Sequence, residues 1–197
     1  MARFHPAKTT KTSVSAATHD ALLDAAEEIL LERSGGLTLE AIAARAKISK
    51  GGLLYHFRSK DALIVAMVAR ITDGVASEFR SHLGEGTPEP GRSIHAFMRT
   101  TWCDSGTAAY RRLNRLSTAL LAVTSDDVRL IKPVQRFYAE VFVAIRADGG
   151  DLGRAFLMLA AADGLWLGQL LGLYTLSTME EKAVANAAEK LLSFSTR

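Results

Sequence analysis

The sequence predicts an all-α fold, with a small N-terminal helix-turn-helix domain followed by a larger helical domain. Apolar residues recur every three to four positions along most of the chain, which is the spacing of one helix face. The 197 residues include only four prolines, and no stretch of convincing length alternates as a strand would. With 48% hydrophobic and 23% charged residues, the chain has the composition of a globular protein with a substantial core.

Four helices are expected in the first part of the chain. Residues 1–17 are expected to form a flexible basic arm, and a first helix is expected over about His19–Arg33. Thr38 caps a two-turn helix, Ser49 caps a second short helix, and Ser59 caps a long one. These positions favour helix starts because a side-chain hydroxyl there accepts an early backbone N–H.

The segment 84–91, with three glycines and two prolines, is the clearest linker. Pro133 lies inside the third helix expected after this linker and predicts either a kink or a later start. Thr178 and Glu181 have the spacing of a capping box for the last helix. The five helices expected after the linker span about 92–103, 108–123, 125–149, 151–176 and 178–194.

Positive charge is concentrated in the N-terminal part, although the net charge of the chain is only +3. A basic stretch fits either a solvated face or contact with DNA phosphates, and composition alone leaves both open. Between residues 41 and 60 there are five bases and no acid, the bases being Arg45, Lys47, Lys50, Arg58 and Lys60.

The segment Thr38–Lys60 has the form of a helix-turn-helix, because two short amphipathic helices are joined by a tight turn and followed by a long helix. The second short helix, Ser49–His56, would enter the major groove of DNA. Lys50 can reach a phosphate or a guanine edge. Gly51 and Gly52 let the backbone approach DNA, at a cost of roughly 1 kcal/mol each in helix propensity.

Four further residues complete the predicted DNA-binding set. Ser49 leaves early backbone N–H groups for a phosphate, Tyr55 and His56 can hydrogen-bond phosphates, and Lys60 can contact the DNA backbone from outside the groove. Each of these residues, taken singly, also fits a solvated or half-buried position. Their occurrence together in this order favours DNA binding.

The segment Thr38–Leu63 closely resembles the DNA-binding domain of TetR-family regulators, and Ala25, Ala26 and Gly36 also match that pattern. The resemblance implies a homodimer with an N-terminal three-helix DNA-binding domain, a helical C-terminal effector domain, and an operator released by a small molecule. It also implies that DNA is faced by Thr38, Lys50, Tyr55, His56 and Lys60.

Two positions depart from the family pattern. Lys47 stands where the turn usually has glycine, so a left-handed backbone there would cost roughly 1 kcal/mol, and its ammonium adds a cation beside the DNA. Gly52 stands where threonine is frequent, which removes one possible base or phosphate contact. Sequence readout is then expected to depend more on Lys50, Tyr55 and DNA shape.

Several protein classes are not favoured. Cys103 is the single cysteine, which excludes an internal disulfide or a cysteine-rich zinc site and fits a reducing cytoplasm. We find no nucleophile elbow, metal-ligand spacing or phosphate loop, so no enzyme, metal or cofactor is expected. No signal peptide is evident. The apolar segment Ala155–Leu176 is long enough to span a bilayer, but Asp163 at its middle favours a buried helix.

Small residues in the last two predicted helices favour dimerisation. Gly164, Gly168 and Gly172 recur every four residues, which on a helix would form one face that another helix can approach closely. A four-helix interface between two subunits is expected, and a tightly packed core within one chain is the alternative. The last helix contributes its apolar stripe to this interface through Val184, Ala188 and Leu191.

A ligand cavity is expected among the helices after the linker. Asp163 stands out because a carboxylate on an apolar helix is costly unless it is satisfied. It could meet a cationic ligand, accept a hydrogen bond from a hydroxyl, or pair with an arginine across the interface. The run 161–168 resembles that of family members that sense aromatic or cationic drugs and control efflux pumps. The predicted lining is Trp102, Tyr138, Phe142, Asp163 and Trp166.

These features predict a ligand-responsive transcriptional repressor that binds a palindromic operator in double-stranded DNA as a dimer and is released by a small aromatic or cationic molecule. The alternative is a DNA-binding regulator without a small-molecule effector. The expected organisation is a flexible basic arm over 1–17, a helix-turn-helix domain over 18–63, a connecting helix over 64–83, a linker over 84–91, and an effector-binding and dimerisation domain over 92–197.

Overall fold

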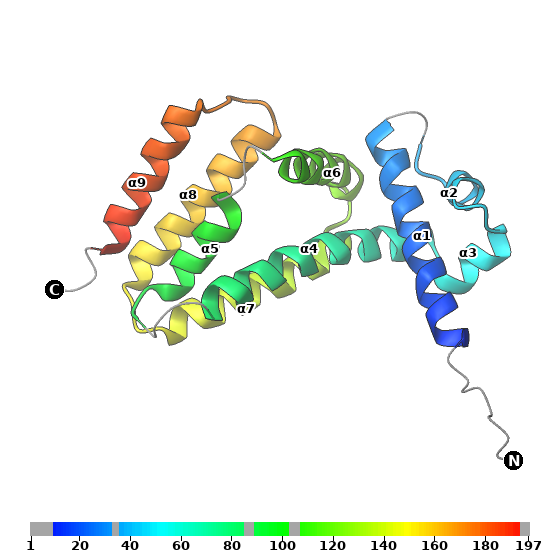
Figure 1. Ribbon diagram of the computed structural model, residues 1–197, viewed down its shortest axis with the longest axis horizontal. Coiled ribbons are helices and arrows are strands. Elements are labelled where there is room, and N and C mark those ends of the chain that lie inside the picture. The colour runs from blue at the N-terminus through cyan, green and yellow to red at the C-terminus, as the bar shows by residue number, and fades with distance from the viewer. Residues whose placement is uncertain (1–9, 33–35, 85–88, 103–106, 194–197) are drawn as a thin grey trace, which may run out of the picture. The chain divides into compact units, whose positions relative to one another are not determined.

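The computed structural model describes residues 10–32, 36–84, 89–102 and 107–193. Within these ranges the chain contains nine α-helices, one 3-10 helix and no strand, so the predicted all-α fold is confirmed (Figure 1). The chain divides after Met67 into two compact units. In the same described ranges, no helix is long and apolar enough to cross a membrane.

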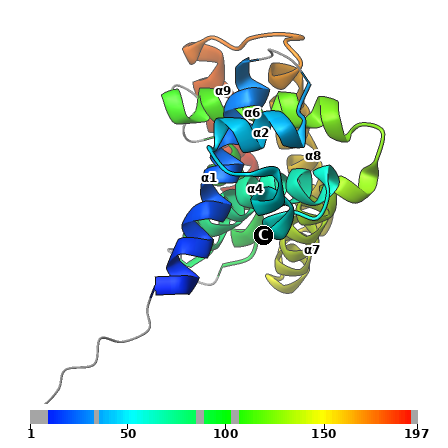
Figure 2. The ribbon, with the colours of Figure 1, turned by 90° about the vertical axis from the view of Figure 1, so that its right-hand side faces the viewer.

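The first unit is built from α1 (Thr10–Glu32), α2 (Leu39–Arg45), α3 (Lys50–His56) and the start of α4 (Lys60–Gly84). Helix α2 contacts both α1 and α3, and both views show α2 beside α1 (Figure 1, Figure 2). The apolar stripes of these helices meet in one core. Its fully buried side chains include Leu22, Ala26, Ile42, Leu53 and Leu63.

The three predicted caps of the first unit are confirmed. The hydroxyl of Thr38 accepts the Ala41 N–H at 3.2 Å, and that of Ser49 accepts the Gly52 N–H at 3.0 Å. Ser59 accepts a backbone N–H three residues later at 3.1 Å in the same way. Each hydroxyl satisfies one of the backbone donors that a helix start leaves without an intrahelical partner.

Two N-terminal boundaries differ from prediction. Helix α1 begins at Thr10, so the expectation of a flexible arm to residue 17 is wrong for 10–17, while residues 1–9 lie outside the described residues. The stretch 10–17 contains no glycine or proline, so the helix extends backward through it once nucleated. The first unit runs to Met67 rather than to residue 63, because Ile64 and Met67 of α4 are buried.

The second unit combines the rest of α4 with α5 (Arg92–Trp102), α6 (Ala108–Thr124), α7 (Lys132–Ala147), α8 (Leu152–Leu170) and α9 (Thr178–Ser193). A short 3-10 helix, η1 (Val128–Ile131), precedes α7. Helix α8 contacts α5, α6 and α7. A contiguous apolar core holds these helices together, and its most buried members include Phe79, Ile94, Val141, Ile145 and Ala162.

Local signals decide where the helices of the second unit begin and end. Pro133 lies in the first turn of α7, which confirms a later start rather than a kink. Helix α8 ends at Leu170, earlier than the predicted residue 176, because Gly172 takes the left-handed backbone with φ +68°. The last capping box is formed by Ser177 and Glu180, one residue earlier than predicted, with the Ser177 N–H donating to the Glu180 carboxylate at 2.7 Å.

Candidate functional site

The short helix α3 presents one face to the core and the other to solvent. Leu53 is fully buried, whereas Tyr55 is 81% exposed and Lys50 and Gly51 are also exposed. This exposed face is the one that the sequence predicted to enter the major groove. Most of the predicted DNA-binding residues are exposed, namely Thr38, Lys47, Ser49, Lys50, Gly51, Tyr55 and Lys60, while Gly52 and His56 are half-buried.

The turn between α2 and α3 depends on a left-handed lysine. Lys47 has φ +56° and, among the described residues other than glycine, it alone has a positive φ. The N–H of the next residue, Ile48, donates to the Ala43 carbonyl at 2.9 Å, which closes the turn. The left-handed conformation at this departure from the family pattern therefore occurs, with its steric cost of roughly 1 kcal/mol.

Replacing Lys47 with glycine is expected to stabilise the first unit. Relief of the left-handed strain of roughly 1 kcal/mol, less the extra backbone entropy of glycine, leaves a gain of up to about 0.5 kcal/mol. The change also removes a cation, so affinity for random DNA should fall. Chemical denaturation of the Lys47→Gly variant measures the first effect, and Lys47→Ala, which removes the same charge but keeps the strain, is the control. Equal stabilities of the two variants would contradict the strain argument.

The two glycines of α3 play different roles. A Cβ placed on Gly51 would meet nothing within 4 Å, so this position is open for close approach by DNA. A Cβ on Gly52 would lie 2.8 Å from the Ile48 methyl Cγ2 and 3.3 Å from the Ser49 hydroxyl. Gly52 is therefore fitted to the packing of the turn, which accounts for the absence of the threonine that is frequent in the family pattern.

Ion pairs engage two of the five bases in the stretch between residues 41 and 60, Arg45 and Lys50. Arg45 bridges α2 to α1, with 2.8 Å between its guanidinium and Glu32 and 3.2 Å to Glu28. Lys50 pairs across α2 and α3 with Glu40, at 2.6 Å between Nζ and Oε1. The hydrogen bond from Lys50 holds the pKa of the Glu40 carboxyl below its usual value. Sequence reasoning did not identify Glu40, because a contact between two separate helices has no fixed spacing.

His56 belongs to a small aromatic cluster at the end of α3. Its ring centroid lies 6.3 Å from that of His19 and 5.3 Å from that of Tyr55. The His19 ring in turn lies 4.7 Å from Phe57. The cluster fixes the ring of His56 at the edge of the exposed face of α3.

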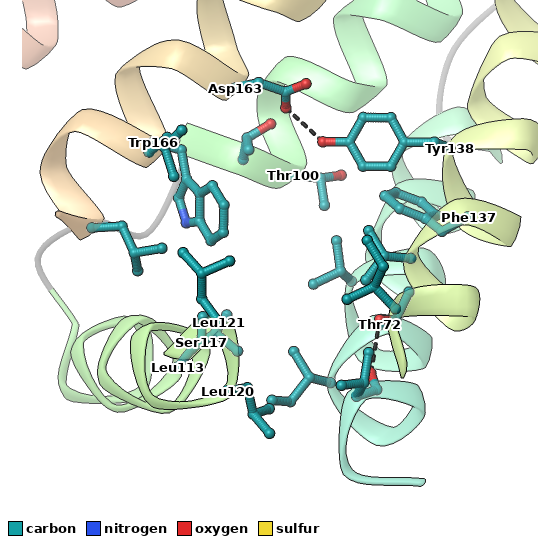
Figure 3. A pocket seen from close by; sticks show the side chains of 18 of the residues that line it. Thr72, Thr100, Leu113, Ser117, Leu120, Leu121, Phe137, Tyr138, Asp163 and Trp166 are labelled. Carbon is teal, nitrogen blue, oxygen red and sulfur yellow. Dashed lines mark hydrogen bonds between the residues drawn. The ribbon is translucent and has the colours of Figure 1, made fainter. Parts of the chain in front are cut away.

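The second unit contains a partly open cavity of about 310 Å³ between α4, α5, α6, α7 and α8 (Figure 3). Tyr138, Asp163 and Trp166 line it, as the sequence predicted. Phe142 does not line it. One turn beyond Tyr138 on α7, its ring packs instead against Phe156 at 5.3 Å between centroids. The side chain of Trp102 lies outside the described residues.

A hydrogen-bonded carboxylate lies at one end of the cavity. The Tyr138 hydroxyl donates to Asp163 Oδ1 at 2.6 Å (Figure 3). The indole N–H of Trp166 donates to Asn114 Oδ1 at 3.2 Å. Burial raises the pKa of the Asp163 carboxyl, and the hydrogen bond from Tyr138 partly opposes that shift. Burial also raises the pKa of Tyr138, so its hydroxyl stays protonated and remains the donor.

The hydroxyl groups of four threonines in the cavity wall donate to backbone carbonyls of their own helices. Each hydroxyl donates to the carbonyl four residues earlier in its helix, at 2.5–2.9 Å, in Thr72, Thr100, Thr101 and Thr124. They therefore present methyl groups and oxygen lone pairs to the cavity. Asp163 is the charged member of the described lining, which includes no lysine, arginine or histidine. This wall suits an apolar molecule that carries a hydrogen-bond donor or a positive charge.

Both units match the same family of regulators. Residues 22–67 match the family described as bacterial regulatory proteins, tetR family, and residues 91–193 match the tetracyclin repressor-like C-terminal domain. The second match alone covers more than half of the chain. The chain belongs to the TetR family. No curated protein matches the sequence.

Solved structures share the TetR fold over nearly the whole chain. A TetR-family member from Streptomyces coelicolor A3 is 25% identical, with a TM-score of 0.68 over 88% of this chain and 97% of the other. The multidrug binding protein EbrR complexed with imidazole is 23% identical, with a TM-score of 0.68 over 95% and 97%. EbrR complexed with proflavin is 25% identical, with a TM-score of 0.59 over 88% and 99%.

The glycine face predicted for the TetR-family dimer is not continuous. Gly172 lies beyond the end of α8, and a Cβ on Gly168 would overlap the ring of Tyr174 from the same chain. The Tyr174 hydroxyl donates to the Gly164 carbonyl at 3.3 Å. The every-four-residue argument was therefore wrong, because it assumed a longer helix. On α9, Leu191 is exposed, whereas Val184 and Ala188 are half-buried.

Proposed function

We propose that this TetR-family protein is a ligand-responsive transcriptional repressor. It binds a palindromic operator as a homodimer and leaves it when a small aromatic cation occupies the cavity. The observation that carries the proposal is the half-buried carboxylate of Asp163 in an otherwise apolar cavity, in a chain whose first unit is a helix-turn-helix. In this proposal the first unit, which ends at Met67, binds DNA, and the second unit, which begins at Val68, binds effector and partner.

The exposed faces of the chain support a DNA-bound dimer. Two recognition helices are needed to reach half-sites roughly 34–36 Å apart. Large apolar side chains that are more than 70% exposed in the single chain include Leu157, Leu173 and Met179. A second copy of the chain that packs on α8 and α9 would cover such side chains. Val184, Ala188 and Leu191 of α9 would lie in or near the same interface.

The chemistry of the cavity supports a cationic ligand. A cation near Asp163 would compensate the desolvated carboxylate, and an aromatic body would fill the space between Trp166, Phe137 and the leucines of α6. Proflavin, a planar aromatic cation, is bound by EbrR, which has a similar fold. By contrast, an anionic ligand would find no cationic side chain in the described wall.

The proposal is tested by selecting DNA from random fragments with the purified protein and titrating the recovered operator against salt and proflavin. A palindrome bound tightly at physiological salt and released by proflavin is the expected result. A palindrome that proflavin and similar cations do not release would favour a regulator without a small-molecule effector. Absence of any enriched sequence would contradict operator binding itself.

Lys60→Ala is expected to weaken binding to every DNA sequence alike. Lys60 is exposed at the start of α4 and is assigned to a phosphate. Loss of one phosphate contact should reduce the slope of log K against log [salt] by about one. Binding isotherms at several salt concentrations measure this slope, with Lys132→Ala in the second unit as control. Weakening confined to the operator would instead assign Lys60 to a base.

A further inference from the structure

The ion pair between Lys50 and Glu40 lies on the face predicted to meet DNA. Glu40 is in the first turn of α2 and Lys50 is the first residue of α3, with 2.6 Å between Nζ and Oε1. Both side chains are more than half exposed, at 57% for Lys50 and 64% for Glu40. Exposed pairs contribute little to the free energy of folding. The pair itself therefore adds little to stability, although an acid in the first turn of α2 also favours the helix dipole.

Other acids of the first unit have different partners. Glu28 and Glu32 are both bound to Arg45, which ties α1 to α2. Glu40 thus pairs with a residue predicted to reach a phosphate or a guanine edge, while Glu28 and Glu32 serve the packing of α1 against α2. This division points to a role for Glu40 in DNA recognition.

We infer that Glu40 is a specificity-determining residue, which directs Lys50 to a base edge and opposes binding to phosphates in general. The inference rests on the proposed function. A lysine ammonium has three donors. One donor held by Glu40 leaves two for the acceptors O6 and N7 of a guanine.

Binding to a phosphate would have a different consequence for Glu40. If Lys50 turned to the DNA backbone, the carboxylate would be left without its cation beside the polyanion. That repulsion acts against random DNA, whereas a guanine contact keeps the pair intact. Discrimination then comes from an unfavourable contact with the wrong partner as well as from a favourable contact with the right one.

The test measures affinities of the Glu40→Gln variant for the selected operator and for random duplex DNA of equal length. Glutamine keeps the size of the side chain and removes the charge. Affinity for random DNA should rise roughly 3- to 10-fold, the scale of one charge contact in water, with little or no gain for the operator. The ratio of operator to random affinity should fall by the same factor.

A double-mutant cycle with Lys50→Met assigns the effect to the pair. In the Lys50→Met background, adding Glu40→Gln should leave the operator-to-random ratio unchanged. Glu78→Gln, which removes an exposed acid from α4 in the second unit, is the charge control and should leave the ratio at the wild-type value. Circular dichroism of each variant checks that it is folded.

Two results would overturn the inference. Equal gains for operator and random DNA in Glu40→Gln would mean that Glu40 acts only as a distant charge. If Glu40→Gln still lowered the operator-to-random affinity ratio in the Lys50→Met background, Glu40 would act on DNA without Lys50. Failure of the wild-type protein to prefer any operator is a separate outcome, which would reject the proposed function and the inference with it.

Discussion

Replacing Leu53 with alanine is expected to unfold the DNA-binding unit while the ligand-binding unit stays folded. Leu53 is 0% exposed in the core of the first unit. Removing a buried leucine side chain typically costs about 2–5 kcal/mol, because transfer energy is lost and a cavity remains. A core of this size supplies only about 3–5 kcal/mol of stability. The variant should therefore lose operator binding and keep binding proflavin.

Leu54 gives a matched control for this prediction. It is the next residue in the chain and has the same side chain, but it is 38% exposed. Leu54→Ala should cost clearly less, about 1 kcal/mol, because part of its side chain is already in solvent. Hydrogen exchange measured separately over 22–67 and 91–193 reports the stability of each unit. Protection of 22–67 that is equal in the two variants would show that burial of Leu53 does not hold the unit together.

Asp163→Asn is expected to weaken proflavin binding while stabilising the ligand-binding unit at neutral pH. Loss of a charge-assisted contact costs about 1.5–3 kcal/mol, which corresponds to roughly 10- to 150-fold in affinity. Stability should change in the opposite direction because burial raises the pKa of Asp163. Folding then penalises the charged carboxylate, and asparagine escapes that penalty while still accepting a hydrogen bond from Tyr138.

The pH dependence has a definite sign. A folded-state pKa above the unfolded value means that the wild-type unit loses stability as pH rises through the folded pKa, relative to the asparagine variant. The stability advantage of Asp163→Asn should therefore be present at neutral pH and disappear below the ordinary pKa of aspartate. Proflavin affinity should fall in the same acid range for the wild type only, since proflavin itself stays cationic there.

Thermal unfolding and proflavin fluorescence across pH check both halves of the Asp163 prediction. Asp126→Asn, an exposed substitution of the same kind in the same unit, is the control and should leave both quantities unchanged. Wild-type proflavin affinity in Asp163→Asn would make the Tyr138–Asp163 hydrogen bond a structural feature only. The effector would then have to be recognised by the apolar wall.

Much of the fold could be predicted from the sequence because the interactions that determine it are local. Hydroxyl caps at Thr38, Ser49 and Ser59 depend on neighbours within three residues, and helical periodicity within one helix shows which side faces the core. Errors arose where a boundary depended on weaker or competing signals. Helix α1 continued back to Thr10 without a stop signal, and Gly172 ended α8 rather than extending a glycine face.

In the candidate sites, too, some residues could be predicted from the sequence, whereas others depended on how the helices pack. Lys50, Tyr55 and Lys60 could be proposed as DNA contacts from their order in the helix-turn-helix segment, and all three are exposed. Pairing of Lys50 with Glu40 could not be predicted, since it depends on how α2 and α3 cross. Likewise the exclusion of Phe142 from the cavity depends on where α7 passes its neighbours.

The sequence by itself determined the all-α class, the helix-turn-helix, the caps and the strained turn at Lys47, because each is set by interactions within a few residues. Only the tertiary structure decided which polar groups remain available to a ligand or to DNA. It brought the Tyr138 hydroxyl to Asp163, Asn114 to Trp166 and Glu40 to Lys50. Those contacts join separate helices, and no periodicity along the chain encodes the distance between two helices.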